Sequence, residues 1–279
     1  MAFGSDMTVA ARPASTTASR PAVIRYADVS KSFASKDGRI EAVRGIDLTV
    51  AEGAFITLVG PSGCGKSTLL NMAAGIFQPS SGSVEYRGVP VTTYNGHVGY
   101  MTQNDHLLPW RDVAGNIGVP LEINGTPKPQ LKAKVEELIE FVGLSGFAKS
   151  YPSQLSGGMR KRTVLARLLA YDPETLLLDE PFAALDAQLR LHLQIELRRI
   201  ARTLNKTVLF VTHDLDEAVA LADRCAIFTS RPGTIRKIID IPLSPDRNLL
   251  RLRHDKDYVA ITAQLWDELA PVIVGGAEG

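Results

Sequence analysis

One stretch decides the fold of this chain: Ala54-Phe55-Ile56-Thr57-Leu58-Val59-Gly60-Pro61-Ser62-Gly63-Cys64-Gly65-Lys66-Ser67-Thr68, followed by Leu69 and Leu70. Its first part is almost wholly apolar and predicts a buried strand, and the residues that follow Lys66 predict a helix. Glycines between the two allow the backbone to turn tightly and to point its amides inward, with no Cβ in the way of an anion. The positive end of the helix faces the same point. The sequence therefore predicts a strand, an anion-binding loop and a helix in succession.

The spacing in this loop is Gly-x-x-x-x-Gly-Lys-Ser, which is typical of the phosphate-binding loop of nucleoside triphosphatases. Lys66 is predicted to reach the β- and γ-phosphates of a nucleoside triphosphate, and the Ser67 hydroxyl is predicted to ligate Mg²⁺. The alternative is a glycine-rich turn in a protein that binds no nucleotide. The complete match between a strand and a helix favours a site for ATP and Mg²⁺ that includes every residue from Gly60 to Thr68.

Composition and length restrict the class of protein. The 279 residues suffice for one large domain or two small ones. The net charge of +1 shows no basic surplus of the kind that nucleic-acid binding needs. The two cysteines, Cys64 and Cys225, form no disulfide framework, which suits a reducing compartment. No stretch approaches the roughly 18–20 apolar residues that cross a bilayer, so we expect a soluble protein.

Strands alternate with helices along most of the chain, which is typical of a parallel α/β sheet. We expect a P-loop NTPase (RecA-like) core with an antiparallel β edge and a helical subdomain inserted at about 96–165. The predicted organisation is a disordered tail over 1–22, an ATPase domain over 23–245 and a short helical extension over 246–279. The predicted strands are 23–26, 45–50, 54–59, 82–86, 97–101, 175–179, 207–212, 224–229 and 234–241, and the predicted helices outside the loop are 131–144, 187–204, 214–222 and 256–270.

Two adjacent carboxylates, Asp179 and Glu180, come at the end of the apolar strand 175–179. P-loop enzymes hold Mg²⁺ with a carboxylate at such a position, so Asp179 is a predicted metal ligand. Glu180 is predicted to accept the proton of an attacking water. The alternative is a pair of acids that only solvates a loop, and the presence of Lys66-Ser67 in the same chain argues against it.

A second anion-binding helix end is predicted at Leu155-Ser156-Gly157-Gly158-Met159, which precedes a strongly helical run. Ser156 is a natural N-cap, and the two glycines expose the first helical amides. By itself such a sequence is more often only a cap. A head-to-tail dimer explains why one phosphate loop is accompanied by two anion-binding ends, since Ser156 of one copy then covers the γ-phosphate that Lys66 of the other copy holds.

Taken together and in this order, the motifs resemble those of the ATPase subunit of ABC transporters over about residues 22–241. Leu-Ser-Gly-Gly is the signature that separates this family from other P-loop ATPases. Small departures from the family pattern are Met159, Lys161 and Ala183, which stand where Gln, Gln, and Gly or Ser are common, and none removes a catalytic group. The resemblance is carried by Gly60–Thr68, Gln103, Leu155–Met159, Leu176–Pro181, Ala184-Leu185-Asp186 and His213.

The resemblance implies roles for four further residues. Phe33 is similar to the aromatic residue that stacks on adenine. Gln103 matches the glutamine that senses Mg²⁺ and the attacking water and that touches the membrane permease. Asp186 matches an aspartate at the dimer contact, and His213 matches the histidine that contacts the γ-phosphate.

Two shorter stretches resemble importers of the nitrate, sulfonate and taurine type: Leu107-Leu108-Pro109-Trp110-Arg111 and Ser230-Arg231-Pro232-Gly233. They imply a subunit that hydrolyses ATP to energise the import of a small anionic solute. Its implied partners are a second copy of itself, an integral-membrane permease and, indirectly, an external solute-binding protein, with no nucleic acid. Its implied location is the cytoplasmic face of the inner (plasma) membrane, as a peripheral protein.

The apolar loop 107–110 also predicts where the permease binds, because apolar side chains on a loop usually mark a protein contact. The alternative is that Trp110 folds back onto the helices of its own subdomain.

Three other classes of protein remain: the ABC ATPase of a lipid-trafficking system, a soluble ABC ATPase that acts on nucleic acid, and a P-loop kinase or GTPase. The last of these has no use for Ser156–Met159, and Asn205-Lys206-Thr207-Val208 lacks the final Asp of a guanine-reading motif.

Overall fold

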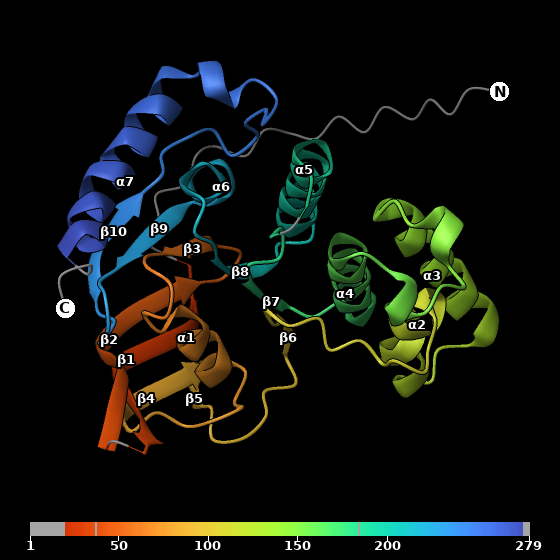
Figure 1. Ribbon diagram of the computed structural model, residues 1–279, viewed down its shortest axis with the longest axis horizontal. Helices are drawn as coiled ribbons and strands as arrows, with labels where there is room; N and C mark the ends of the chain where they lie inside the picture. Colours follow the sequence, from red (N-terminus) through yellow and green to blue (C-terminus); the bar gives the residue numbers. More distant parts are fainter. Residues whose placement is uncertain (1–19, 37, 184, 276–279) are drawn as a thin grey trace.

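The computed structural model describes residues 20–36, 38–183 and 185–275. Its central element is a six-stranded sheet with the strand order β10-β9-β3-β8-β7-β6, and the five strands from β9 to β6 run parallel (Figure 1). β10 is antiparallel to β9. The expected P-loop NTPase core is therefore confirmed. The strands of this sheet are β3 (Phe55–Val59), β6 (Val98–Met101), β7 (Thr175–Asp179), β8 (Thr207–Val211), β9 (Arg224–Phe228) and β10 (Ile235–Asp240).

Both faces of this sheet are covered, which explains why its strands are continuous apolar runs. Along β3, Phe55 and Val59 face one hydrophobic core, whereas Ile56 and Leu58 face the other. The first core lies against α5 (Ala187–Thr203), α6 (Leu215–Leu221) and α7 (Lys256–Gly275). Figure 1 shows α7 beside β9 and β10 at the far end from the helical subdomain.

The second core lies between the parallel sheet and a separate four-stranded antiparallel sheet with the order β2-β1-β4-β5. The antiparallel part expected from the sequence is thus a sheet of its own. Helix α1 (Lys66–Ala73), which opens directly from the phosphate loop, contacts both sheets. The four strands are β1 (Ala22–Ser35), β2 (Gly38–Ala51), β4 (Ser81–Tyr86) and β5 (Val89–Pro90).

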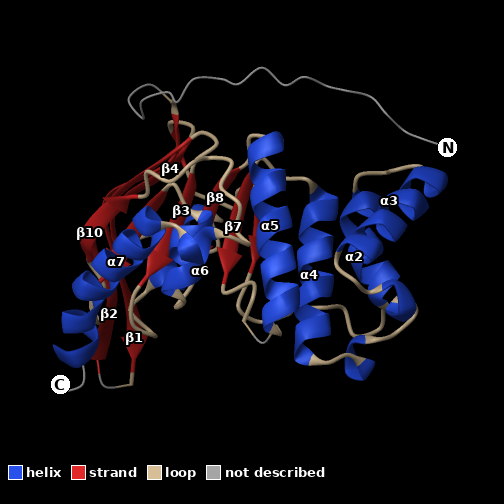
Figure 2. Cartoon of the chain, turned by 90° about the horizontal axis from the view of Figure 1, so that it is seen from above, coloured by secondary structure: helices blue, strands red, loops and turns tan. Residues whose placement is uncertain are grey.

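The inserted subdomain has its own small core, formed by α2 (Val113–Ile123), α3 (Lys128–Phe141) and α4 (Gly157–Tyr171). Short 3-10 turns lie at Ser145–Phe147 and Pro152–Gln154, and another, Leu252–His254, precedes α7. In both views the subdomain lies beyond α5, on the side away from the antiparallel sheet (Figure 2). The helical elements of the subdomain lie within slightly different limits from the expected bounds of about 96–165. β6 pairs with β7 inside the central sheet, and α4 continues to Tyr171.

The sequence predicts a tail at one end of the chain and a helical extension at the other. The predicted disordered tail, residues 1–22, falls outside the described residues as far as residue 19, and Ala22 already pairs with Ala51 in the antiparallel sheet. The helix expected at 256–270 is α7, which continues to Gly275. Tyr258 of α7 donates a hydrogen bond from its hydroxyl to Asp216 of α6 at 2.6 Å, so the extension packs onto the core.

Candidate active site

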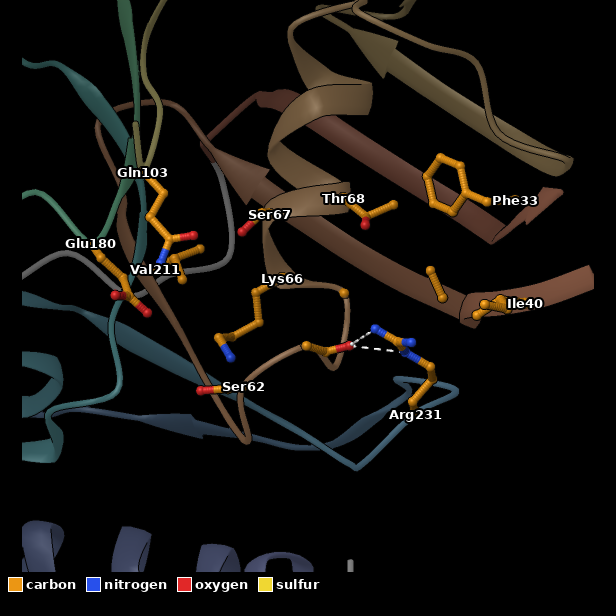
Figure 3. Close-up of a pocket in the computed structure, with 13 residues that line it drawn as sticks. Phe33, Ile40, Ser62, Lys66, Ser67, Thr68, Gln103, Glu180, Val211 and Arg231 are labelled. Carbon is orange, nitrogen blue, oxygen red and sulfur yellow. Dashed lines mark hydrogen bonds between the residues drawn. The ribbon is translucent and has the colours of Figure 1, made fainter. Parts of the chain in front are cut away.

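A cavity of about 440 Å³ opens at the phosphate loop, which is within the roughly 300–1,000 Å³ of ligand pockets (Figure 3). It lies where β3 runs into α1, so the helix N-terminus and the carboxyl ends of the strands meet there. Parallel sheets with helices on both faces commonly bind ligands at this edge. The lining residues are Phe33, Ile40, Ala42, Ser62, Gly63, Gly65, Lys66, Ser67, Thr68, Gln103, Glu180, Val211 and Arg231.

The loop backbone forms a cradle that only glycine permits. Gly65 has a φ of +99°, and a Cβ built there would lie 2.3 Å from Val43 Cγ1 and 2.8 Å from the carbonyl oxygen of Ala42. The Lys66 side chain is buried, and its Nζ donates to the carbonyl oxygens of Gly60 and Pro61, both at 2.8 Å. The ammonium is therefore held within the loop, where a phosphate oxygen can replace a carbonyl acceptor.

Some residues of the predicted loop support its shape without lining the cavity. Gly60, Pro61 and Cys64 do not line the cavity, although they belong to the expected nucleotide-binding set. Gly60 and Pro61 provide the carbonyl acceptors for Lys66, and the Cys64 side chain is buried beneath the loop. Ser62, Gly63, Gly65 and Thr68 line the cavity directly.

Ser67 and Asp179 come together at the end of β7, and the pair fits a hard divalent cation such as Mg²⁺. Asp179 is only 3% exposed. Burial raises the pKa of its carboxyl, whereas a hydrogen bond from the Ser67 hydroxyl and the charge of Lys66 act in the opposite direction. A hydroxyl and a buried carboxylate beside a cationic phosphate loop are the donor set that a Mg²⁺-nucleotide needs.

The raised pKa gives a prediction for stability. The carboxylate of Asp179 destabilises the folded protein at pH values above its raised pKa, and the effect disappears below the ordinary value of 3.8, where both states are protonated. An Asp179→Asn variant keeps an acceptor for Ser67 and loses the charge. Without nucleotide at pH 7, we expect its Tm to rise, because the buried charge that destabilises the folded state is gone. Scanning calorimetry should show the difference shrinking as the pH falls; a lower Tm for the variant would contradict this account.

Glu180 follows Asp179 directly and turns into the cavity because its backbone is left-handed, with a φ of +50°. Its main-chain N–H donates to the carbonyl oxygen of Val211 at 3.0 Å, which fixes the turn to the neighbouring strand β8. Figure 3 shows the Glu180 carboxylate and the Gln103 side chain on the same side of the cavity. These two predicted residues therefore line the same cavity as the phosphate loop.

His213 lies beside Glu180 and does not line the main cavity. Its Nδ1 is 3.5 Å from Glu180 Oε1, and both residues line a smaller neighbouring cavity. His213 is thus placed next to a residue that lines the main cavity.

Phe33 lies at the opposite end of the cavity, on β1 and paired in register with Ile40 of β2. Its ring is 39% exposed and packs edge-on against Phe77 at a centroid distance of 5.4 Å. Lys31 Nζ lies 5.3 Å from the centroid of the same ring. One face of an aromatic ring is thereby supported at the mouth of the cavity, a suitable place for a base to stack.

Four predicted residues lie away from this cavity. Ser156, Gly157 and Gly158 open α4 in the helical subdomain, where Ser156 Oγ accepts a hydrogen bond from Met159 N at 3.3 Å. Asp186 caps α5, with its carboxylate accepting from Leu189 N at 3.0 Å. None of the four lines the cavity. The helix end at the phosphate loop and the helix end at Ser156 are therefore both present, but they do not come together within one chain.

Sequence reasoning missed Arg231, which lines the cavity from the loop between β9 and β10. Its Nε and Nη2 donate to the carbonyl oxygen of Gly63 at 3.1 and 2.9 Å (Figure 3). Nearby, a Cβ on Gly233 would lie 1.9 Å from the carbonyl oxygen of Cys64. The stretch Ser230–Gly233, which in the sequence indicated only a class of importer, thus packs against the phosphate loop and holds it.

Comparison with known proteins agrees with this geometry. The sequence pattern of the family described as "ABC transporter" matches residues 43–183. The aliphatic sulfonates import ATP-binding protein SsuB of Bacillus subtilis is 44% identical over 85% of this chain and 91% of its own length. An uncharacterized ABC transporter ATP-binding protein of Methanocaldococcus jannaschii, MJ0412, is 45% identical over 81% of this chain and 84% of its own length. The dimeric structure of the ATP-binding cassette MJ0796, bound to ADP and Pi, superposes with a TM-score of 0.74 at 26% identity and covers 79% of this chain and all of that one.

The strand, the phosphate loop and the buried Asp179 define a P-loop nucleoside triphosphatase. The chain belongs to the ABC transporter family, as an ATP-binding subunit, and it is an ATP hydrolase coupled to transport. Within the described part of the chain, none of the helices combines the length and the apolar character that crossing a bilayer requires.

Proposed function

We propose that this subunit energises a membrane importer for a small anionic solute such as a sulfonate, nitrate or taurine, and that two copies enclose ATP and Mg²⁺ between them at the cytoplasmic face of the inner membrane. The observation that carries the dimer is the separation of the two anion-binding helix ends. One chain places the phosphate loop at the cavity and the Ser156 end in another subdomain. The dimeric state named for MJ0796 supports the same arrangement.

In this proposal each residue has a definite task. Lys66 and the loop amides bind the phosphates, and the Ser156 end of the other copy covers the γ-phosphate. When bound at Ser67 and Asp179, with Gln103 beside them, Mg²⁺ supplies a positive charge that neutralises the phosphate oxygens. Glu180 accepts the proton of the attacking water, and His213 lies against its carboxylate to orient it. Phe33 stacks on the adenine, and Asp186 meets the other copy.

The proposed solute class rests on the aliphatic sulfonate importers among the relatives. The decisive experiment is to purify the subunit with the membrane proteins that accompany it and reconstitute them in liposomes with the external binding protein. Uptake of an alkanesulfonate, taurine or nitrate that requires internal ATP would support the proposal. Movement of a lipid instead would overturn the importer class.

The proposed contact with the permease is the loop 107–111 between β6 and α2. Trp110 is 71% exposed, so it does not fold back onto its own subdomain. The buried Asn116 holds the loop in shape: its Oδ1 accepts from Leu108 N, and its Nδ2 donates to the carbonyl oxygens of Leu108 and Arg111 at 2.8–3.1 Å. An exposed aromatic side chain on a loop held in this way is a suitable anchor for a partner helix.

A Trp110→Ala variant is therefore expected to bind ATP normally and to lose association with the permease by tenfold or more, since loss of an interface hot spot costs about 2 kcal/mol or more. Co-sedimentation with permease-containing membranes measures this. Trp266→Ala is the matched control, because Trp266 is also exposed (55%) but lies on α7. Equal recovery of the Trp110 variant and wild type would place the contact elsewhere.

A further inference from the structure

The segment that follows β6 is bound by basic side chains of α4. Arg160 Nε donates to Asp105 Oδ2 at 2.9 Å, and Arg167 Nη1 donates to the carbonyl oxygen of His106 at 3.0 Å. Between them, Lys161 Nζ donates to the carbonyl oxygen of Gln103 and lies 3.9 Å from Asp105 Oδ1. Gln103, Asp105 and His106 are thus each hydrogen-bonded to a basic side chain of α4.

Lys161 is more buried than its neighbour Arg160, and it alone of the three basic residues donates to the carbonyl oxygen of Gln103. Its side chain is 10% exposed, whereas that of Arg160 is 38% exposed. A buried ammonium needs compensating acceptors, and here these are the Gln103 carbonyl and the Asp105 carboxylate. Because both acceptors belong to one short segment, the position of that segment is tied to Lys161.

Gln103 connects the nucleotide cavity to α4. Its side chain lies in the cavity, and its main chain is hydrogen-bonded to a residue of α4. The side chain lines the cavity with Glu180 and Ser67, while the carbonyl oxygen of the same residue accepts from Lys161. The strand β6 ends at Met101, where its pairing with Leu178 anchors it to the central sheet. The change of attachment from sheet to helix therefore falls between Met101 and Gln103.

We propose that Lys161 is a positioning residue that makes the placement of Gln103 at the nucleotide depend on α4. This rests on the role proposed above for Gln103. Lys161 lies five residues beyond Ser156 on one continuous helix, which corresponds to about 7.5 Å at 1.5 Å per residue. A shift of the Ser156 end, when it meets the other copy's nucleotide, therefore displaces the Gln103 carbonyl in the same chain.

The test is a double-mutant cycle on ATP turnover of the full chain. Lys161→Met removes the donor and keeps an apolar stem of similar length. We expect kcat to fall about tenfold, with ATP affinity within twofold of wild type, because the phosphate loop is untouched and a hydrogen bond from a charged group is lost. Lys161→Arg restores a charged donor and should recover most of the loss. In a Gln103→Ala background, Lys161→Met should have almost no further effect on kcat, since the side chain that it positions is gone.

Arg162→Met is the matched control on the same helix. Arg162 Nη1 also donates to two backbone carbonyls, of Val142 at 2.9 Å and Gly143 at 2.8 Å, but these belong to the helical subdomain itself. We expect this variant to keep wild-type kcat even if its Tm falls. If Lys161→Met fails to fold, Lys161→Gln enters the same cycle, because its amide can donate but carries no charge.

The outcomes separate the inference from the role of Gln103. If Gln103→Ala lowers kcat and Lys161→Met leaves it unchanged, the inference is overturned and the role of Gln103 stands. Losses that multiply in full in the double variant also overturn it, since Lys161 then acts independently of Gln103. If Gln103→Ala leaves kcat at the wild-type value, the role of Gln103 is refuted, and the inference with it.

Discussion

A Glu180→Gln variant is expected to bind ATP with unchanged affinity and to lose turnover by about 10²–10⁴-fold, the contribution of a positioned general base. The carboxamide has the shape of the carboxylate but cannot accept the proton. The main-chain hydrogen bond from Glu180 to Val211, which fixes the left-handed turn, is unaffected by the change. Nucleotide binding and hydrolysis are measured separately, by equilibrium titration and by phosphate release.

The control for this variant is Glu174→Gln. Glu174 precedes β7, at the opposite end of the strand from Glu180, and it makes a surface ion pair with Arg87 at 3.1 Å. Its substitution should leave turnover unchanged. Near wild-type turnover in Glu180→Gln would assign the base elsewhere, and His213, whose Nδ1 is 3.5 Å from the Glu180 carboxylate, is then the next residue to test.

A Gly157→Asp variant is expected to abolish the ATP-dependent dimer while ATP binding by the single chain is retained. The new carboxylate would stand against the γ-phosphate held by the other copy. Two unit charges about 4 Å apart repel by about 4 kcal/mol at an effective dielectric constant of 20, which weakens association by about a thousandfold at each site. Light scattering in a Glu180→Gln background, where ATP persists, should show a monomer.

Within one chain the site tolerates this substitution sterically, so a lost dimer does not reflect a distorted α4. A Cβ on Gly157 would meet only the flexible Arg160 Nη2, at 3.8 Å. Gly146→Asp is the matched control in the same subdomain, because a Cβ there meets nothing within 4 Å. We expect that control to dimerise with ATP as the parent does. A persistent ATP-induced dimer of the Gly157 variant would refute the head-to-tail arrangement.

The features that the sequence predicted best depend on local geometry. The phosphate loop is recognised because the turn, the inward amides and the helix start all lie within a few consecutive residues around Gly65. The strands β3, β7 and β8 are recognised because burial on both faces demands unbroken apolar runs. Ser156 is recognisable as an N-cap because its hydroxyl accepts a hydrogen bond from the amide of Met159, three residues ahead.

The bounds of the helical subdomain show where this reasoning fails. Four residues of β6 form a strand because they pair with β7, which follows them in the sequence only after the whole subdomain. The sequence predicts this short strand at 97–101, but no local signal assigns it to the central sheet rather than to the start of the insertion. Its place at the edge of the central sheet is a tertiary property.

By itself, the sequence determined the local parts of this protein, each encoded within a few adjacent residues: a phosphate loop, a carboxylate after a buried strand and a capped helix end that we propose binds a second anion. Only the tertiary structure decided how these parts are held and where they meet. Arg231 bonds Gly63 across 168 positions and Lys161 bonds Gln103 across 58. Such contacts form because sheet pairing and core packing bring distant segments together. The local sequence around one partner does not predict the other.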